Sequence, residues 1–164
     1  MKIRISQLQE GHHSLSLLEG AQSLGLTDTE RFDHDVQVAI EIDKRGRNLF
    51  IHEIVHTNAR FQCDRCLEPF SRDLDSDFRV TYSSDPEFVR LDEDIRLIPP
   101  DQAEIDISED VRETVLLAIP IKLLCKEDCK GLCPHCGANL NFETCTCPGP
   151  QLDPRWEALK KLME

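Results

Sequence analysis

Eight cysteines are the residues of this sequence best suited to chemistry. Cys63 and Cys66 form a Cys-x-x-Cys pair, and the other six cysteines fall between Cys125 and Cys147. Zinc takes four ligands in a tetrahedron, and a gap of two residues lets one tight turn direct two thiolates at the same ion. The pattern therefore predicts structural zinc, with two ions held by four cysteines each.

The downstream cysteines contain one compact candidate site. Cys133 and Cys136 flank a short turn that Gly137 follows, and a glycine there lets the backbone curl so that its amides face the sulfurs. Cys145 and Cys147 add a second pair after eight intervening residues. These four cysteines are predicted to hold one zinc ion.

The remaining cysteines again number four: Cys63, Cys66, Cys125 and Cys129. A zinc ion held by them would join segments about sixty residues apart, and closing so long a loop gives a metal its largest entropic benefit. Cys129 and Cys133 are near enough in sequence to exchange between the two sets. The sequence therefore leaves open the division of the cysteines, and also whether both sites are filled.

Other uses of the cysteines fit the sequence less well. Disulfides require an oxidising compartment, the ferredoxin spacings of iron–sulfur proteins are absent, and a redox Cys-x-x-Cys pair normally opens a helix. Eight buried free cysteines arising by chance is a further alternative. His135 lies inside the Cys133–Cys136 turn, but with four thiolates available we expect it to be an exposed bystander.

Alternating apolar residues predict the strands that position the first cysteine pair. Val36, Val38, Ile40 and Ile42 alternate with polar residues, which is typical of a half-buried strand. A basic turn at residues 44–48 leads to a second strand over residues 49–61, and a third follows over residues 70–82. The second and third strands flank Cys63–Cys66, so we expect a hairpin with that segment at its tip.

A helix is predicted to follow Asp106, which with Glu109 three residues later resembles a capping box. Pro120 ends or kinks this helix, and its apolar face is formed by Ile107, Val111, Val115, Ala118 and Ile119. Asp153-Pro154 is typical of the start of a short final helix, with Trp156, Leu159 and Leu162 as its buried stripe.

Other segments are predicted to be less regular. Residues 1–8 form a short strand, His12 and His13 lie in a solvated loop, and the acid-rich residues 84–100 form a loop or poorly ordered connector. The predicted fold class is α+β, an antiparallel β-sheet with a packed helix and a C-terminal zinc-knuckle segment. We divide the chain into an α+β domain over residues 1–124 and a cysteine-rich zinc-binding tail over residues 125–164.

The charge balance restricts the partners of the protein. Asp and Glu number 31 against 19 Lys and Arg, which gives a net charge of -12, and such a field repels a nucleic-acid backbone at long range. Any RNA contact is then local or carried by a partner, and the basic candidates near the hairpin are Lys44, Arg45, Arg47, Arg65 and Arg72. No apolar run reaches the length of a signal peptide or a membrane span, which favours the cytoplasm, where thiols stay reduced.

Two blocks of residues resemble a known family. Cys63-Asp64-Arg65-Cys66-Leu67-Glu68-Pro69-Phe70 is similar to the Cys-x-Arg-Cys-Leu-x-Pro-Phe segment of the YceD family of large ribosomal RNA subunit accumulation proteins. The second block runs from Cys129 through Gly137 and Asn139-Leu140-Asn141 to Cys145-x-Cys147, and the tail begins with Asp153-Pro154-Arg155-Trp156. The resemblance implies a cytoplasmic, non-enzymatic protein needed for normal accumulation of large-subunit ribosomal RNA.

The leading hypothesis is therefore a non-enzymatic, zinc-binding factor for ribosome biogenesis. Its expected partner is ribosomal RNA, a large-subunit ribosomal protein or an assembly intermediate, with no membrane and no small-molecule substrate. The alternative is a metal-handling or thiol redox protein. A hydrolase using His52 or His56 lacks a matched nucleophile, and the acidic residues 85–110 are either a solvated linker or a mimic of nucleic-acid phosphate.

Overall fold

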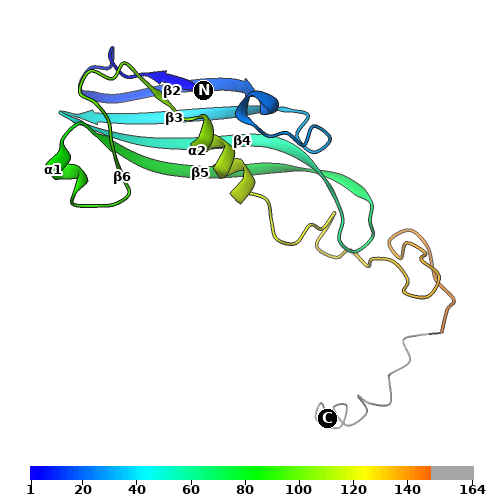
Figure 1. The fold of residues 1–164 in the computed structure, drawn as a ribbon. Helices are drawn as coiled ribbons and strands as arrows, with labels where there is room; N and C mark the ends of the chain where they lie inside the picture. The colour runs from blue at the N-terminus through cyan, green and yellow to red at the C-terminus, as the bar shows by residue number, and fades with distance from the viewer. Residues whose placement is uncertain (149–164) are drawn as a thin grey trace, which may run out of the picture.

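The main element of the fold is a five-stranded sheet with the order β2-β3-β4-β5-β6 (Figure 1). The computed structural model describes residues 1–148. The strands are β2 (Gly11–Gly20), β3 (Asp35–Arg45), β4 (Asn48–Gln62), β5 (Pro69–Ser83) and β6 (Ile95–Leu97). Neighbouring strands are antiparallel except β5 and β6, which are parallel. This architecture agrees with the predicted α+β class.

The alternation in the sequence decides which face of each strand is buried. Val36, Val38, Ile40 and Ile42 of β3 are each at most 1% exposed, and the residues between them face solvent or lie at the surface. β4 and β5 pair from Asn48↔Ser83 to Gln62↔Pro69. The predicted hairpin is confirmed, and it carries the Cys63–Cys66 segment at its tip.

One helix covers the buried face of the sheet. α2 (Ser108–Leu117) lies across β4 and β5 in Figure 1, and Ile107, Val111 and Val115 of its predicted apolar face are at most 1% exposed. The expected capping box is wrong, because the N-cap is Ile107 and the Glu109 carboxylate instead accepts a hydrogen bond from Arg112 at 3.0 Å. Asp106 Oδ1 accepts the Ser108 amide at 3.0 Å, one residue before the Glu109 amide that a capping box would use.

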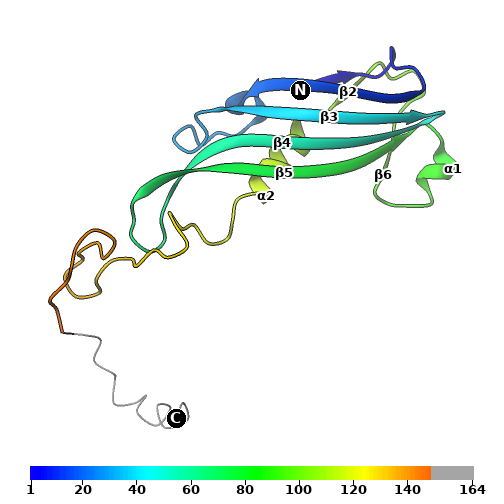
Figure 2. The same cartoon turned by 180° about the vertical axis from the view of Figure 1, so that it is seen from behind.

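The opposite face of the sheet is covered by no other part of the described chain (Figure 2). The segment after α2 leaves the sheet at the end where the β4–β5 hairpin turns, so the cysteine-rich residues lie beside the hairpin tip. The fold thus brings two segments together at one end of the sheet that are far apart in sequence.

Two expectations about irregular segments are wrong. His12 and His13 lie in β2, a ten-residue edge strand whose Leu15 and Leu17 pack against the core. The acid-rich segment contains α1 (Pro86–Val89) and β6. It is anchored by Arg96, which donates two hydrogen bonds of 2.6 and 2.7 Å to the buried Asp110 carboxylate of α2. Sequence periodicity does not reveal such an anchor because the partner lies on another element.

The remaining described elements are short. β1 (Lys2–Arg4), the strand expected near the start of the chain, pairs with β7 (Glu104–Asp106), and η1 (Ala21–Leu24) is a 3-10 turn. The final helix expected from Asp153 lies outside the described residues, and the predicted division after residue 124 stays a prediction. Across residues 1–148, none of the helices has the length and apolar character that crossing a membrane requires.

Candidate metal centre

The hairpin tip presents Cys63 and Cys66 on a single tight turn. The Leu67 amide donates to the Cys63 carbonyl at 2.9 Å, and the Cys63 amide donates to the Glu68 carbonyl at 2.9 Å. Leu67 adopts a left-handed backbone with φ of 60°, a region that disfavours residues with a side chain. The turn forces this conformation on Leu67 because the chain must curl around the two sulfurs.

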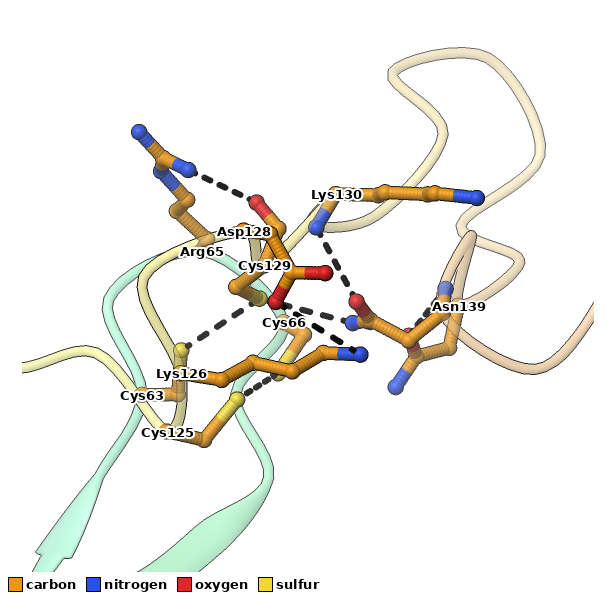
Figure 3. A network of polar contacts seen from close by, with 10 residues as sticks. Cys63, Arg65, Cys66, Cys125, Lys126, Asp128, Cys129, Lys130 and Asn139 are labelled. Carbon is orange, nitrogen blue, oxygen red and sulfur yellow. Dashed lines mark hydrogen bonds and ion pairs between the residues drawn. The ribbon is translucent and has the colours of Figure 1, made fainter.

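The segment after α2 supplies the other two cysteines of this group. The Asp64 amide donates to the Leu123 carbonyl at 2.8 Å, and the Leu123 amide donates to the Asp64 carboxylate at 2.7 Å. The Arg65 guanidinium donates to the Cys129 carbonyl at 2.7 Å (Figure 3). These contacts attach the segment to the hairpin tip and place Cys125 and Cys129 against Cys63 and Cys66.

The four sulfurs of this first group lie at distances that suit a tetrahedral ion. Cys63 Sγ is 3.8 Å from Cys129 Sγ, and Cys66 Sγ is 3.6 Å from Cys125 Sγ. Metal–sulfur bonds of about 2.3 Å give sulfur–sulfur edges of about 3.8 Å in a tetrahedron, whereas a disulfide needs about 2.05 Å. The first group therefore fits a metal ion and contains no disulfide.

A second group forms from Cys133, Cys136, Cys145 and Cys147, whose sulfurs lie within 4.8 Å of one another. Its turn repeats the geometry of the hairpin tip: Gly137 has φ of 75°, and its amide donates to the Cys133 carbonyl at 2.9 Å. The Cys145 sulfur is 3.3 Å from the Cys133 sulfur and 3.5 Å from that of Cys136. The two groups have the same membership as the two sets inferred from the sequence; that they bind metal stays a prediction.

The two groups differ in burial. Cys63, Cys66 and Cys129 are at most 3% exposed, and Phe70, Leu124 and Leu132 pack around them. In the second group Cys133 is buried and Cys136 is exposed. The first group thus lies in a small apolar core, and the second lies at the surface.

Hydrogen bonds prepare one thiol of each group for deprotonation. Burial raises the pKa of Cys63, but backbone hydrogen bonds from Cys125, Cys66 and Arg65 outweigh burial and lower this pKa to about 6. Backbone hydrogen bonds from Cys136 and His135 lower the pKa of Cys133 to about 6. Metal binding requires thiolates, so in each group at least one of the four cysteines already favours the form that binds a cation.

Another thiol in each group holds its proton more firmly. Burial, together with hydrogen bonding to Cys66, raises the pKa of Cys125 to about 12. The hydrogen bond shared with Cys145 raises the pKa of Cys147 to about 12. The protons that remain on these sulfurs are the ones that a bound cation would have to displace.

Several side chains considered at the sequence level lie away from both groups. His135 is exposed and belongs to neither group. His52 Nε2 lies 3.0 Å from Asp77 and His56 Nδ1 lies 2.7 Å from Asp75, on the sheet face opposite α2. Within residues 1–148 neither ring contacts a hydroxyl or a thiol through a hydrogen bond, so these histidines assemble no activated nucleophile there.

The candidate basic residues do not form one surface. Lys44, Arg45 and Arg47 lie at the β3–β4 turn, whereas Arg65 and Arg72 lie at the other end of β4. Lys44 Nζ also donates to the Leu8 carbonyl at 2.6 Å, and Arg45 pairs with Asp43. Of the five candidate contact residues, only Arg65 and Arg72 therefore lie near the cysteine hairpin tip.

One polar residue at the first group was not expected from the sequence. Asn141 Nδ2 donates to Cys129 Sγ at 3.4 Å, although Asn141 lies in the loop between the cysteines of the second group. The Asn139-Leu140-Asn141 motif was visible in the sequence, but its contact with another site depends on tertiary structure.

Comparison with known proteins identifies a family that covers both cysteine groups. The family described as "Large ribosomal RNA subunit accumulation protein YceD" matches residues 51–163, which include all eight cysteines. No solved structure matches the chain significantly.

Named relatives are found in plants and bacteria. The protein "Large ribosomal RNA subunit accumulation protein YCED homolog 1, chloroplastic" of Arabidopsis thaliana is 31% identical over 79% of this chain and 49% of its own length. The protein of the same name from Zea mays is 30% identical over 68% of this chain and 48% of its own. An uncharacterized protein of Mycobacterium tuberculosis is 33% identical over 62% of this chain and 49% of its own.

The extent of these matches decides what they show. The chain spans about half the length of the curated relatives it matches, so their names describe longer proteins. The family match, however, covers more than half of this chain and includes both cysteine blocks. The chain therefore belongs to the YceD family of large ribosomal RNA subunit accumulation proteins.

Proposed function

We propose that this protein is a non-enzymatic, zinc-binding factor needed for the accumulation of large-subunit ribosomal RNA, and that it acts in ribosome biogenesis. The observation that supports this role is membership of the YceD family, whose named plant relatives are large ribosomal RNA subunit accumulation proteins. In this proposal the cysteines shape and hold a binding surface, and the protein works through contacts with a partner.

Zinc is the metal that suits the donor sets. All four donors in each group are sulfur, and tetrahedral sets of four thiolates select zinc or iron–sulfur clusters. A single ion fits the sulfur–sulfur distances of 3.6 and 3.8 Å in the first group. A reducing compartment such as the cytoplasm would keep the thiols available for metal.

The proposed partner is ribosomal RNA, a large-subunit ribosomal protein or an assembly intermediate. The net charge of -12 favours contact through a basic protein over direct contact with a nucleic-acid backbone. Asp73, Asp75 and Asp77 are exposed at alternate positions of β5, opposite in direction to the buried Leu74. They therefore lie on the face of the sheet away from the core, where they repel phosphate. A nucleic-acid backbone would thus meet least repulsion away from this face.

Depletion of the protein in its source organism tests the role in biogenesis. We expect large-subunit precursors to change in a sucrose gradient and large-subunit ribosomal RNA to fall relative to small-subunit RNA. Complementation with the wild-type chain should restore both, whereas Cys63→Ser should not. Unchanged subunit profiles and ribosomal RNA levels after depletion would contradict the proposal.

Native mass spectrometry of the purified chain tests the metal. Two zinc ions per chain are expected, released slowly by a chelator and with loss of structure around the cysteines. A metal-handling protein would instead exchange its zinc rapidly without a structural change, and a thiol redox protein would cycle between thiol and disulfide. Either result would replace the structural role proposed for the cysteines.

A further inference from the structure

The loop closed by the second cysteine group reaches back to the first. Asn141 lies between Cys136 and Cys145 in sequence, and its Nδ2 donates to the sulfur of Cys129 at 3.4 Å. Its Oδ1 accepts the Lys130 amide at 3.0 Å. A backbone amide can only donate, so this second contact fixes the orientation of the Asn141 side chain and directs its NH₂ group at the sulfur.

Asn139 of the same loop supports this arrangement. Its Oδ1 accepts hydrogen bonds from the Asn141 amide at 3.1 Å and from Asn141 Nδ2 at 2.9 Å. Its Nδ2 donates to the Glu68 carboxylate at 3.3 Å, just beyond Cys66. Figure 3 shows Asn139 beside Lys130 and the first cysteine group. The loop therefore contacts both the hairpin tip and the segment after α2, the two parts of the chain that form the first group.

Backbone hydrogen bonds of the residues between the two groups hold the loop close to the hairpin tip. The Leu132 amide donates to the Arg65 carbonyl at 3.1 Å, and the Leu140 amide donates to the Gly131 carbonyl at 2.9 Å. Gly131 has φ of 76°, and a Cβ there would lie 3.0 Å from the Arg65 carbonyl oxygen. A glycine is needed for this close approach of the two chain segments.

We propose that the two cysteine groups bind metal cooperatively, with Asn141 as the positioning residue that couples them. This inference rests on the metal binding proposed above. When the second group closes on its ion, residues 137–144 are held in a short loop and the Asn141 amide is placed against Cys129. A hydrogen bond to a metal-bound thiolate stabilises its charge and orients the ligand, so filling the second site strengthens the first.

Site-resolved chelator titration of the zinc-loaded full chain tests the coupling. Alkylation of free thiols, followed by mass spectrometry of cysteine peptides, measures the occupancy of each group at each chelator concentration. We expect Asn141→Ala to lower the zinc affinity of the first group about tenfold. Because coupling between two sites is reciprocal, the variant should also remove any gain in affinity that a filled first group gives the second. Cys136→Ser, which opens the second group, should also lower the affinity of the first.

A double variant and a control make the result specific. If Asn141 transmits the coupling, Asn141→Ala combined with Cys136→Ser should weaken the first group no further than Cys136→Ser does alone. Phe142→Ala removes a side chain that is 80% exposed in the same loop, and it should leave both groups unchanged.

Three outcomes would overturn the coupling while leaving the metal proposal intact. They are unchanged zinc affinity of the first group in Asn141→Ala, an equal loss in Phe142→Ala, and losses that add in the double variant. Wild-type protein that binds no zinc at either group would instead contradict the metal proposal, and the coupling with it.

Discussion

Beneath α2 the sheet buries many apolar side chains, most of them Val, Ile and Leu, whereas the cysteine end buries mainly sulfur. Each Val or Ile side chain removed from water contributes about 1.5–3 kcal/mol, and the sheet has many of them. Around the first cysteine group only Phe70, Leu124 and Leu132 pack against the sulfurs. The sheet can therefore be stable through apolar packing alone. The cysteine end has only this small apolar core, so we expect its stability to depend on the proposed metal ion.

Of the changes considered, removing the metal should lower stability most, and it should do so only at the cysteine end. Structural zinc contributes on the order of 10 kcal/mol to small metal-held units. After chelation, we expect backbone amides of residues 123–148 to lose protection from hydrogen exchange. Amides of β3 should keep it. Simultaneous loss of protection in β3 and the cysteine end would show that the two ends form one unit.

Serine substitutions should separate the two cysteine groups. Cys63 is fully buried and joins the hairpin tip to the segment after α2, whereas Cys136 is exposed within a local loop. We expect Cys63→Ser to lower the melting temperature more than Cys136→Ser, with each variant losing the ion of its own group. Native mass spectrometry and thermal unfolding measure the two effects. Equal melting temperatures would mean that neither the burial of the first group nor its closing of a long loop adds to stability.

Truncating the sheet core should leave the metal in place. Ile40→Ala removes a side chain that is 1% exposed, and such a change costs about 2–5 kcal/mol. Urea unfolding with saturating zinc should show this loss, with two zinc ions still bound to the folded variant. Leu18→Ala is the matched control, because Leu18 is 66% exposed and its loss should change stability by less than about 0.5 kcal/mol. Loss of metal in Ile40→Ala would contradict the independence of the ends.

The two ends should respond to pH in opposite directions. Burial, with a smaller contribution from the Asp110 carboxylate, raises the pKa of Glu53 from 4.5 to about 8, while Arg96 opposes the shift. Among residues 1–148, neither Glu53 carboxyl oxygen has a hydrogen-bond partner. The folded sheet therefore retains a proton that the unfolded chain releases, and its stability falls as pH rises from about 4.5 to about 8, by at most about 1.4 kcal/mol per pH unit.

The cysteine end should instead lose metal as pH falls, because protons compete with the ion for the thiolates. Glu53→Gln keeps the side-chain shape without the titration, so the sheet of this variant should unfold at a nearly constant urea concentration between pH 6 and 8. Urea unfolding of β3, followed by hydrogen exchange, measures this. A variant with the same pH dependence as wild type would show that another group is responsible.

Much of the sheet could be predicted from the sequence because its signal is local. The alternation from Val36 to Ile42 reports directly which side chains face the core, and it is confirmed. β2 was missed because an edge strand is only half-buried and its serines and histidines weaken the alternation. α1 and β6 were missed because the segment 84–100 is held by the contact of Arg96 with Asp110, which no local pattern encodes.

The candidate site, like the sheet, has some features that local sequence patterns predict and others that they do not. Spacing alone was enough to suggest the turns at Cys63–Cys66 and Cys133–Cys136, since two thiolates two residues apart converge within one turn. The sequence thus determined the ligand chemistry, the hairpin and the apolar face of α2. Only the tertiary structure decided that Cys125 and Cys129 meet the hairpin tip and that Asn141 reaches Cys129. It also decided that Glu53 is buried with no hydrogen-bond partner in the described part of the chain. These outcomes depend on where segments distant in sequence come to lie, and that is determined by the packing of the whole chain.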